Sequence, residues 1–303
     1  MIRTKSSAAL LSVFSNSLLI ALKLAAAAIT GSIAILTEAI HSSIDLLASF
    51  VALVSVRRAD IPPDEDHPYG HEKAENLAAS IEGMLILVGA GIIVFEATRR
   101  LVIGSEVDSI GVGIAVIAFS AILNLAVSGL LGRRARSLAS PALEGDAAHL
   151  RADALTSLGV LAGLALVELT DEPAFDSIAA LVVAAAIVVS GVRIMRRSSS
   201  VLMDEAPPRE ELDLIEAAIV ASKPPEMLGY HKLRARRAGA RRWVDLHVQF
   251  VSGTSLERAH EAAHELRDAI GVELPRSDVL IHVEPESSHR EGDAGPLGPA
   301  DPD

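Results

Sequence analysis

Long apolar stretches dominate the first two thirds of the chain. Between Ser7 and Gly191, several windows of about 20 residues carry almost no charge, and a helix of that length crosses a bilayer. Six stretches are long enough, which predicts an all-α membrane bundle of six transmembrane helices within residues 1–203. Gly31 and Pro173 mark predicted turns. The predicted spans are Ser7–Thr30, Ser32–Val56, Leu77–Ala97, Ile110–Leu131, Leu143–Leu169 and Asp176–Met195.

The pattern changes after Met203. Pro207 and Pro208 break the chain, and about 80 residues of mixed polarity follow. Helical spacing and strand-like alternation predict, in order, a helix, two strands, a helix and a strand: Glu210–Ser222, Tyr230–Arg236, Trp243–Val251, Ser255–Ile270 and Val279–Val283. This order predicts a small α+β domain over residues 207–286. The Gly-, Pro- and Asp-rich tail, residues 287–303, is predicted to be disordered.

Lysine and arginine are distributed unevenly over the loops between the predicted spans. With both termini in the cytoplasm, the outer loops hold only Arg99 and Arg100. The positive-inside rule therefore predicts cytoplasmic N- and C-termini. No targeting segment is evident, so we expect a multi-pass protein of the bacterial inner (plasma) membrane. The inner side would hold Arg3, Lys5, Arg57, Arg58, Lys73, Arg133, Arg134, Arg136, Arg193, Arg196 and Arg197.

Composition excludes several classes of protein and of site. The 303 residues carry a net charge of −12, which argues against a nucleic-acid partner. Because the sequence has no cysteine, disulfides, thiolate zinc sites and cysteine nucleophiles are excluded. It has ten histidines, so imidazole and carboxylate groups are the plausible metal ligands.

Two predicted spans carry the same pair of ionisable residues. His41 and Asp45 lie in the second span, and His149 and Asp153 lie in the fifth. Residues four apart share one helix face, so each pair can offer a nitrogen and an oxygen in one direction. Two facing pairs would form a tetrahedral set that suits Zn²⁺. Structural ion pairs explain one such motif, but two at matching depth favour a metal site. In the third span, Glu82 could face a water-filled vestibule.

Histidines also gather outside the predicted spans. Asp64, His67 and His71 lie in the Pro- and Gly-containing loop after the second span. These residues either bind a metal or form a solvated charged loop, and the residue types alone favour neither interpretation. In the C-terminal domain, side chains on separate elements favour a buried metal cluster over routine core histidines. These side chains are His231, His247, His260, His282 and Glu284.

One motif in the C-terminal domain suggests a different chemistry. His260, Glu261 and His264 form a literal His-Glu-x-x-His on a predicted helix, the signature of zinc proteases. Two imidazoles on one helix face would bind zinc, and Glu261 would act as general base. The domain of roughly 80 residues leaves no room for a substrate cleft, however. We therefore keep a zinc protease only as a remote alternative.

These motifs together resemble the cation diffusion facilitator family of divalent-metal transporters. The resemblance extends from about Ser7 to Pro285, and its motifs agree in kind, order and position relative to the predicted spans. It implies a homodimer of six-span subunits in the lipid bilayer, each with a ferredoxin-like, metallochaperone-like cytoplasmic domain. It rests on Gly31–Asp45, His67–Glu75, His149–Asp153 and Val279–Pro285.

The resemblance also implies roles for individual residues. His41, Asp45, His149 and Asp153 would form the transport site. Asp64, His67 and His71 match the family's loop metal site, and Lys73 and Asp204 fall where some members form a charged interlock. The cytoplasmic metal site, whose ions help to hold the dimer together, is matched by His231, His247, His260, His282 and Glu284.

The expected function is Zn²⁺/H⁺ antiport, a secondary active transport rather than an enzymatic reaction. Zinc would be both transported and structural, and protons would be the counter-ion. Many bacterial members of the family have Asp where this chain has His41, and two histidines with two aspartates are similar to the zinc-selective members. Export of Fe²⁺, Co²⁺, Cd²⁺ or Mn²⁺ by alternating access is the alternative. A membrane-tethered metal sensor is a more remote one, since it would leave the doubled motif unexplained.

Overall fold

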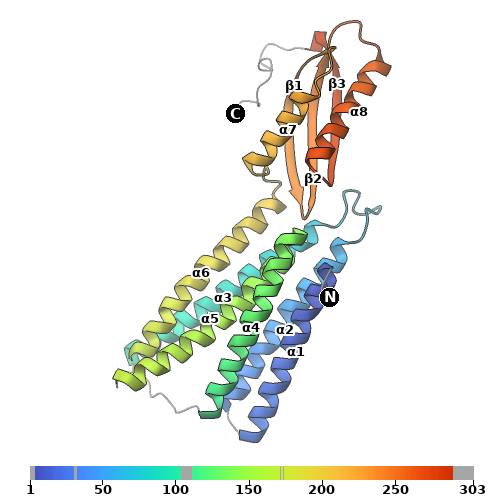
Figure 1. Ribbon diagram of the computed structural model, residues 1–303. Helices are drawn as coiled ribbons and strands as arrows, with labels where there is room; N and C mark the ends of the chain where they lie inside the picture. The colour runs from blue at the N-terminus through green and yellow to red at the C-terminus, as the bar shows by residue number, and fades with distance from the viewer. Residues whose placement is uncertain (1–3, 31–32, 104–110, 171, 173, 289–303) are drawn as a thin grey trace. The chain divides into compact units, whose positions relative to one another are not determined.

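The computed structural model describes residues 4–30, 33–103, 111–170, 172 and 174–288. The chain divides into two compact units, residues 1–200 and 201–303. The first contains six long helices, α1 (Lys5–Thr30), α2 (Ile33–Ala59), α3 (Lys73–Ile103), α4 (Gly111–Leu138), α5 (Pro141–Thr170) and α6 (Ala174–Leu202) (Figure 1). The second contains α7 (Arg209–Ala221), β1 (Met227–Ala238), β2 (Arg241–Phe250), α8 (Leu256–Glu273), β3 (Ser277–Pro285) and the 3₁₀ turn η1 (Glu286–Ser288).

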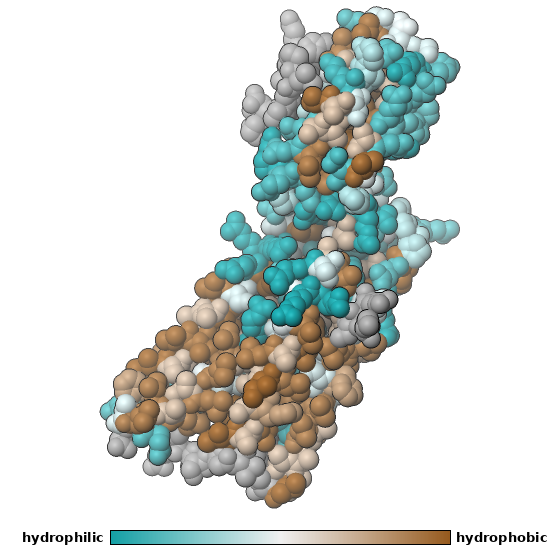
Figure 2. Space-filling view, in the orientation of Figure 1, coloured by the Kyte–Doolittle hydropathy of each residue, from teal (hydrophilic) through white to brown (hydrophobic). Residues whose placement is uncertain are grey.

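Apolar side chains cover the outer surface of the six-helix unit. α1, α3, α4, α5 and α6 are long and apolar enough to cross a membrane. Figure 2 shows hydrophobic side chains spread over the visible face of this unit, and Phe14 and Phe95 are 68% and 70% exposed. Lipid tails are as apolar as leucine, so such side chains need no protein cover in a membrane. α2 has 27 residues, and its role as a sixth span stays a prediction.

Small residues let α3 lie close to two neighbouring helices. A Cβ atom at Gly83 of α3 would stand 2.9 Å from the backbone nitrogen of Met195 in α6. A Cβ atom at Gly145 of α5 would stand 3.1 Å from the Cα atom of Ala79 in α3. Larger side chains would push these helices apart, since close helix contacts in membranes depend on small residues.

A buried charged contact joins three helices at one end of the bundle. Glu75 of α3 is 1% exposed. Its carboxylate accepts a hydrogen bond from Lys5 Nζ of α1 at 2.5 Å and another from the Ser140 hydroxyl, immediately before α5. A carboxylate without partners would be costly in this environment. These two contacts therefore hold the ends of α1, α3 and α5 together.

The helices extend beyond the predicted apolar spans. α3 continues to Ile103 rather than Ala97, and α4 continues to Leu138 rather than Leu131. In the extension of α3, Arg100 Nε donates to Glu96 Oε1 at 3.0 Å, a contact between residues four apart that stabilises a helix outside the apolar core. The predicted turn residues Gly31 and Pro173 lie outside the described residues.

A three-stranded sheet forms the framework of the second unit. The strand order is β1-β2-β3, with β1 antiparallel and β3 parallel to β2. Alternate residues of β2, including Leu246 and Val248, are buried in a core with Ile215 of α7 and with Leu266 and Ile270 of α8. The helices therefore cover one face of the sheet, and the residues between these core positions lie on the opposite face.

A β-bulge in β1 changes which residues face the core. The register pairs His231 with His247 and then Arg234 with Asp245, so one extra residue lies in β1 between these pairs. Lys232, inside the bulge, has a φ of +51°. After the bulge, Leu233 packs against the core. His231 therefore shares the helix-free face with His247, although Tyr230 beside it is buried in the core.

Glu211 joins α7 to the sheet through two arginines. Its carboxylate accepts hydrogen bonds from Arg237 Nε at 3.0 Å and from Arg242 Nη2 at 2.7 Å. Burial alone would raise the pKa of Glu211, but the bonds from Arg242 and Arg237 lower the pKa below its ordinary value. The ionised carboxylate is thus bound more favourably in the folded unit than in the unfolded chain.

We expect Glu211→Gln to lower the stability of this unit by about 1 kcal/mol near neutral pH, since the charged contact is partly screened by solvent. A lowered folded pKa stabilises the unit above the ordinary pKa, and this contribution disappears as the pH falls through the lowered value. Unfolding of the full chain can be followed by the fluorescence of Trp243, the one tryptophan of the sequence. The control Glu210→Gln changes an exposed neighbour. Equal stability of the two variants across this pH range would contradict the prediction.

Candidate metal centres

Three groups of histidine and acidic side chains lie close enough to share a metal ion within the described part of the chain. Their potential ligand atoms lie within 4.8 Å of one another in each group. One group lies inside the helix bundle, one in the loop between α2 and α3, and one on the sheet of the second unit. The groups are Asp45, His149 and Asp153; Asp64, His67 and His71; and His231, His247 and Glu284.

The group inside the bundle joins α2 to α5. His149 Nε2 lies 3.3 Å from Asp45 Oδ1 and 3.8 Å from Asp153 Oδ2. Asp45 and His149 are each 6% exposed. His149 and Asp153 lie one turn apart on the same face of α5. The packing of α5 against α2 places Asp45 beside them. The three side chains thus offer one nitrogen and two carboxylates around one point.

His41 lies in α2, four residues before Asp45, but its side chain is outside the described residues. Its part in the site therefore stays a prediction. α1 contacts α2 next to this position: Asn16 donates to the backbone oxygen of Asp45 at 3.3 Å and to Ser49 Oγ at 2.8 Å. These bonds position the turn of α2 that carries Asp45.

A fully buried carboxylate that the sequence analysis missed lies next to this group. Asp146 of α5 is 0% exposed, and its Oδ1 accepts hydrogen bonds from the hydroxyls of Ser12 and Ser49, both at 2.9 Å. These bonds join α1, α2 and α5. Asp146 lies three residues before His149, within the predicted fifth span. This spacing places both side chains on one face of the helix, and it could have identified Asp146 from the sequence.

Glu82 of α3 is also buried rather than in a water-filled vestibule. Its side chain is 0% exposed, and Oε2 lies 3.9 Å from His149 Nδ1. The prediction of a solvent-facing Glu82 is therefore wrong, because close packing of α3 against α5 leaves this side chain inside the bundle. Arg151, a cation two residues before Asp153 on α5, is exposed.

The loop group is organised around Asp64. Asp64 Oδ1 accepts a hydrogen bond from the backbone N–H of His67 at 2.7 Å, and this bond is the main reason that the pKa of Asp64 lies below its ordinary value. Asp64 Oδ2 lies 3.3 Å from His71 Nε2, and the rings of His67 and His71 have centroids 4.4 Å apart. The loop thus brings all three predicted side chains together.

The third group lies on the helix-free face of the sheet. Glu284 of β3 contacts His231 Nε2 at 2.9 Å and His247 Nδ1 at 2.6 Å. Burial alone would raise the pKa of Glu284, but the bonds to His247 and His231 lower its pKa. His282 lies beside the group, with Nε2 3.7 Å from Glu284 Oε1 and its ring 4.6 Å from that of His247.

His260 does not join this group within one chain. It is exposed on α8, whose buried residues pack against the opposite face of the sheet. Its ring lies 4.3 Å from that of His264, as expected for residues four apart on one helix. Glu261 is exposed, with Oε2 3.5 Å from Arg258 Nη1. The predicted five-residue cytoplasmic cluster is therefore divided between the two sides of the sheet.

The remaining predicted contact concerns Lys73 and Asp204. Lys73 begins α3 in the first unit. Asp204 belongs to the second unit, where its Oδ1 accepts a hydrogen bond from Arg236 Nη1 at 3.0 Å. The interlock between Lys73 and Asp204 stays a prediction.

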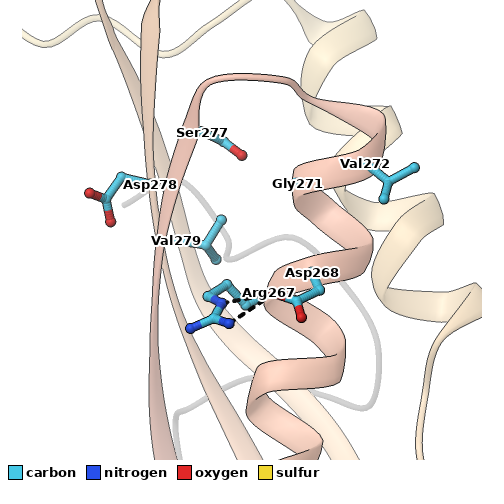
Figure 3. Close-up of a pocket in the computed structure, with 7 residues that line it drawn as sticks. All are labelled: Arg267, Asp268, Gly271, Val272, Ser277, Asp278 and Val279. Carbon is cyan, nitrogen blue, oxygen red and sulfur yellow. Dashed lines mark hydrogen bonds and ion pairs between the residues drawn. The ribbon is translucent and has the colours of Figure 1, made fainter.

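A shallow groove beside α8 contains none of the predicted ligands among the residues that line it. Figure 3 shows the side chains around it, with the Arg267 guanidinium bonded to Asp268 at 2.9 Å on α8 and facing β3. The groove therefore offers no counterpart to the three metal groups. It is lined by Arg267, Asp268, Gly271, Val272, Ser277, Asp278 and Val279.

Two family models match most of the length of this chain. Residues 9–203 match the family model described as "Cation efflux transmembrane domain", and residues 207–286 match "Cation efflux protein, cytoplasmic domain". An uncharacterized transporter, sll1263, of Synechocystis sp. is 34% identical over 87% of this chain and 85% of its own length.

Two further proteins are similar to this chain, one over nearly its whole length and one over a much smaller part of it. The cation-efflux pump FieF of Serratia proteamaculans is 33% identical, over 97% of both chains. A solved structure, the metal-bound C-terminal domain of the CzcD transporter from Thermotoga maritima, is 27% identical. It covers 25% of this chain and 88% of its own, with a TM-score of 0.24.

We expect Asp146→Ala to destabilise the helix bundle, because the hydroxyls of Ser12 and Ser49 would lose their shared acceptor. The cost of unsatisfied buried groups is about 1–3 kcal/mol. The fraction of monodisperse protein that survives heating in detergent measures this loss. Asp146→Asn keeps an acceptor oxygen and should survive at higher temperature than Asp146→Ala. If Asp146→Ala survives as well as the unchanged chain, this network does not stabilise the bundle.

Proposed function

Because the chain belongs to the cation diffusion facilitator family of metal-cation efflux transporters, we propose that it exports Zn²⁺ from the cytoplasm in exchange for protons. The observation that carries this proposal is the convergence of Asp45, His149 and Asp153 inside the helix bundle. Ionisable groups at such depth are costly and typically mark an ion pathway.

The donor chemistry supports zinc as the substrate. Asp45, His149 and Asp153 supply two carboxylates and one imidazole. We propose His41 as the fourth ligand, because it lies one helical turn before Asp45 on α2. Two nitrogens and two oxygens can form the tetrahedral set that Zn²⁺ accepts. Fe²⁺, Co²⁺, Cd²⁺ and Mn²⁺ are the alternative substrates, since selectivity among divalent metals in the cell also depends on site geometry and on metal availability.

Proton exchange follows from the protonation states that metal binding requires. Imidazole ligands bind a metal when neutral, and carboxylates bind it when ionised, so a bound metal displaces protons. Zn²⁺ released on the far side of the membrane would leave ligands that take up protons again. Alternating access then requires helices that move around a site near the middle of the bundle.

The second unit supports a homodimer with further metal sites. The sheet carries His231, His247 and Glu284 on the face that its own helices leave uncovered. On this face, Leu280 is 67% exposed and the His282 side chain is 63% exposed. We propose that a second copy of the chain covers this surface and that zinc binds there. The loop residues around Asp64 would form a separate metal site. We also propose an inner-membrane location with both termini in the cytoplasm, as the arginine and lysine distribution indicates.

We expect Asp153→Ala to reduce Zn²⁺ transport in proteoliposomes to the rate of empty vesicles, because the buried site loses a carboxylate ligand. A zinc-sensitive dye inside the vesicles measures the flux. Glu261→Gln is the matched control, since it changes an exposed acidic residue of the protease-like motif and should preserve the flux. Transport by Asp153→Ala at the unchanged rate would exclude this group as the transport site. Peptidase activity lost in Glu261→Gln would favour the protease alternative.

We expect Zn²⁺ entry into the vesicle lumen to make the lumen more alkaline, because protons leave in exchange. A pH-sensitive dye recorded with the zinc dye checks the coupling. Addition of Mn²⁺, Fe²⁺, Co²⁺ or Cd²⁺ as competitors tests the choice of metal, and Zn²⁺ should be the preferred substrate. Zinc flux with no pH change would contradict antiport, and preferential transport of another ion would contradict zinc selectivity.

A further inference from the structure

Two buried polar atoms face each other beside the proposed transport site. His149 Nδ1 and Glu82 Oε2 are 3.9 Å apart. Among the described residues, neither His149 Nδ1 nor either carboxylate oxygen of Glu82 has a hydrogen-bond partner. Glu82 is 0% exposed and His149 is 6% exposed. Buried polar groups are normally paired, so this arrangement calls for a physical reason.

Helix packing directs Glu82 toward His149. Gly145 lies four residues before His149 on α5, and therefore on the same helix face. A Cβ atom at Gly145 would stand 3.1 Å from Glu82 Cβ and 3.2 Å from Glu82 Cγ. The glycine thus leaves space for the Glu82 side chain to run along α5. Its carboxylate then lies near Nδ1 of the imidazole, whereas the two aspartates lie near Nε2.

The two ring nitrogens of His149 have different surroundings. Nε2 lies 3.3 Å from Asp45 Oδ1 and 3.8 Å from Asp153 Oδ2. Nδ1 faces Glu82. In metal sites, the ligating histidine usually donates its second N–H to a carboxylate, which fixes the tautomer and the ring orientation. A ligating Nε2 would make Nδ1 the N–H donor, directed at Glu82.

We propose that Glu82 is a positioning residue of the transport site: its carboxylate accepts a hydrogen bond from His149 Nδ1–H and holds Nε2 toward the metal ion. This inference rests on the proposed function of Asp45, His149 and Asp153. The gap of 3.9 Å is about 1 Å longer than a hydrogen bond, and hydrogen bonds at unliganded sites often tighten when the ligand binds. Through this contact, metal binding at α2 and α5 would also act on α3.

Metal binding to the purified full chain tests the proposal. Zn²⁺ affinity is measured in detergent by competition with a fluorescent chelator, and the binding event lost in Asp153→Ala identifies the transport site. At that site, we expect Glu82→Ala to weaken Zn²⁺ binding about 10–100-fold. This is the typical loss of affinity when the hydrogen-bond partner of a ligating histidine is removed. Glu82→Gln keeps an acceptor oxygen and should lose less affinity. Glu96→Gln, on the same helix but 38% exposed at its side chain, should bind like the unchanged chain.

A second readout separates positioning from stability. The visible spectrum of Co²⁺ bound at the same site reports the ligand geometry, and it should change in Glu82→Gln but not in Glu96→Gln. Unchanged Zn²⁺ affinity and Co²⁺ spectra in both Glu82 variants would overturn the proposal, even if their melting temperatures fell. If Asp153→Ala retains every Zn²⁺-binding event that the unchanged chain shows, the proposed transport site is wrong, and the proposed role of Glu82 is wrong with it.

Discussion

Charged and polar side chains buried among apolar helices must find partners inside the bundle, and this requirement governs the arrangement of the six-helix unit. Lipid is as apolar as these helices, so contacts between the helices depend on close packing of small residues and on polar contacts. Three sets of polar contacts link the helices. One set joins α1, α3 and the start of α5, a second joins α1, α2 and α5, and a third joins α2 to α5. Their members are Lys5, Glu75 and Ser140; Ser12, Ser49 and Asp146; and Asp45, His149 and Asp153.

α5 is common to all three sets. Within a short stretch it carries Gly145, Asp146, His149 and Asp153, and Ser140 immediately precedes it. The glycine admits the side chain of Glu82 from α3, and the three ionisable residues lie along neighbouring turns. Any displacement of α5 would therefore change the metal group and its supporting hydrogen bonds together. If this group is the transport site, as we propose, the linkage would connect metal occupancy to movement of the helices.

The second unit uses the same donor chemistry in a different physical setting. Alternation along β2 separates core residues such as Leu246 from potential metal ligands such as His247, so the two faces of one sheet carry the core and the histidine group. The bulge at Lys232 preserves this separation in β1 by returning Leu233 to the core after His231. The histidine group of the sheet lies on a face that the helices of its own unit leave uncovered, whereas the group inside the helix bundle is enclosed by its own chain.

The sequence by itself determined the features that depend on short spacing. Apolar length predicted the helices, and the four-residue separation of His149 and Asp153 placed them on one face, because helical geometry fixes neighbours along the chain. Only the tertiary structure decided which helices meet. Packing of α2 against α5 brought Asp45 to His149, close approach of α3 buried Glu82, and the sheet separated His260 from His247. These outcomes depend on contacts between distant segments, which local periodicity does not specify.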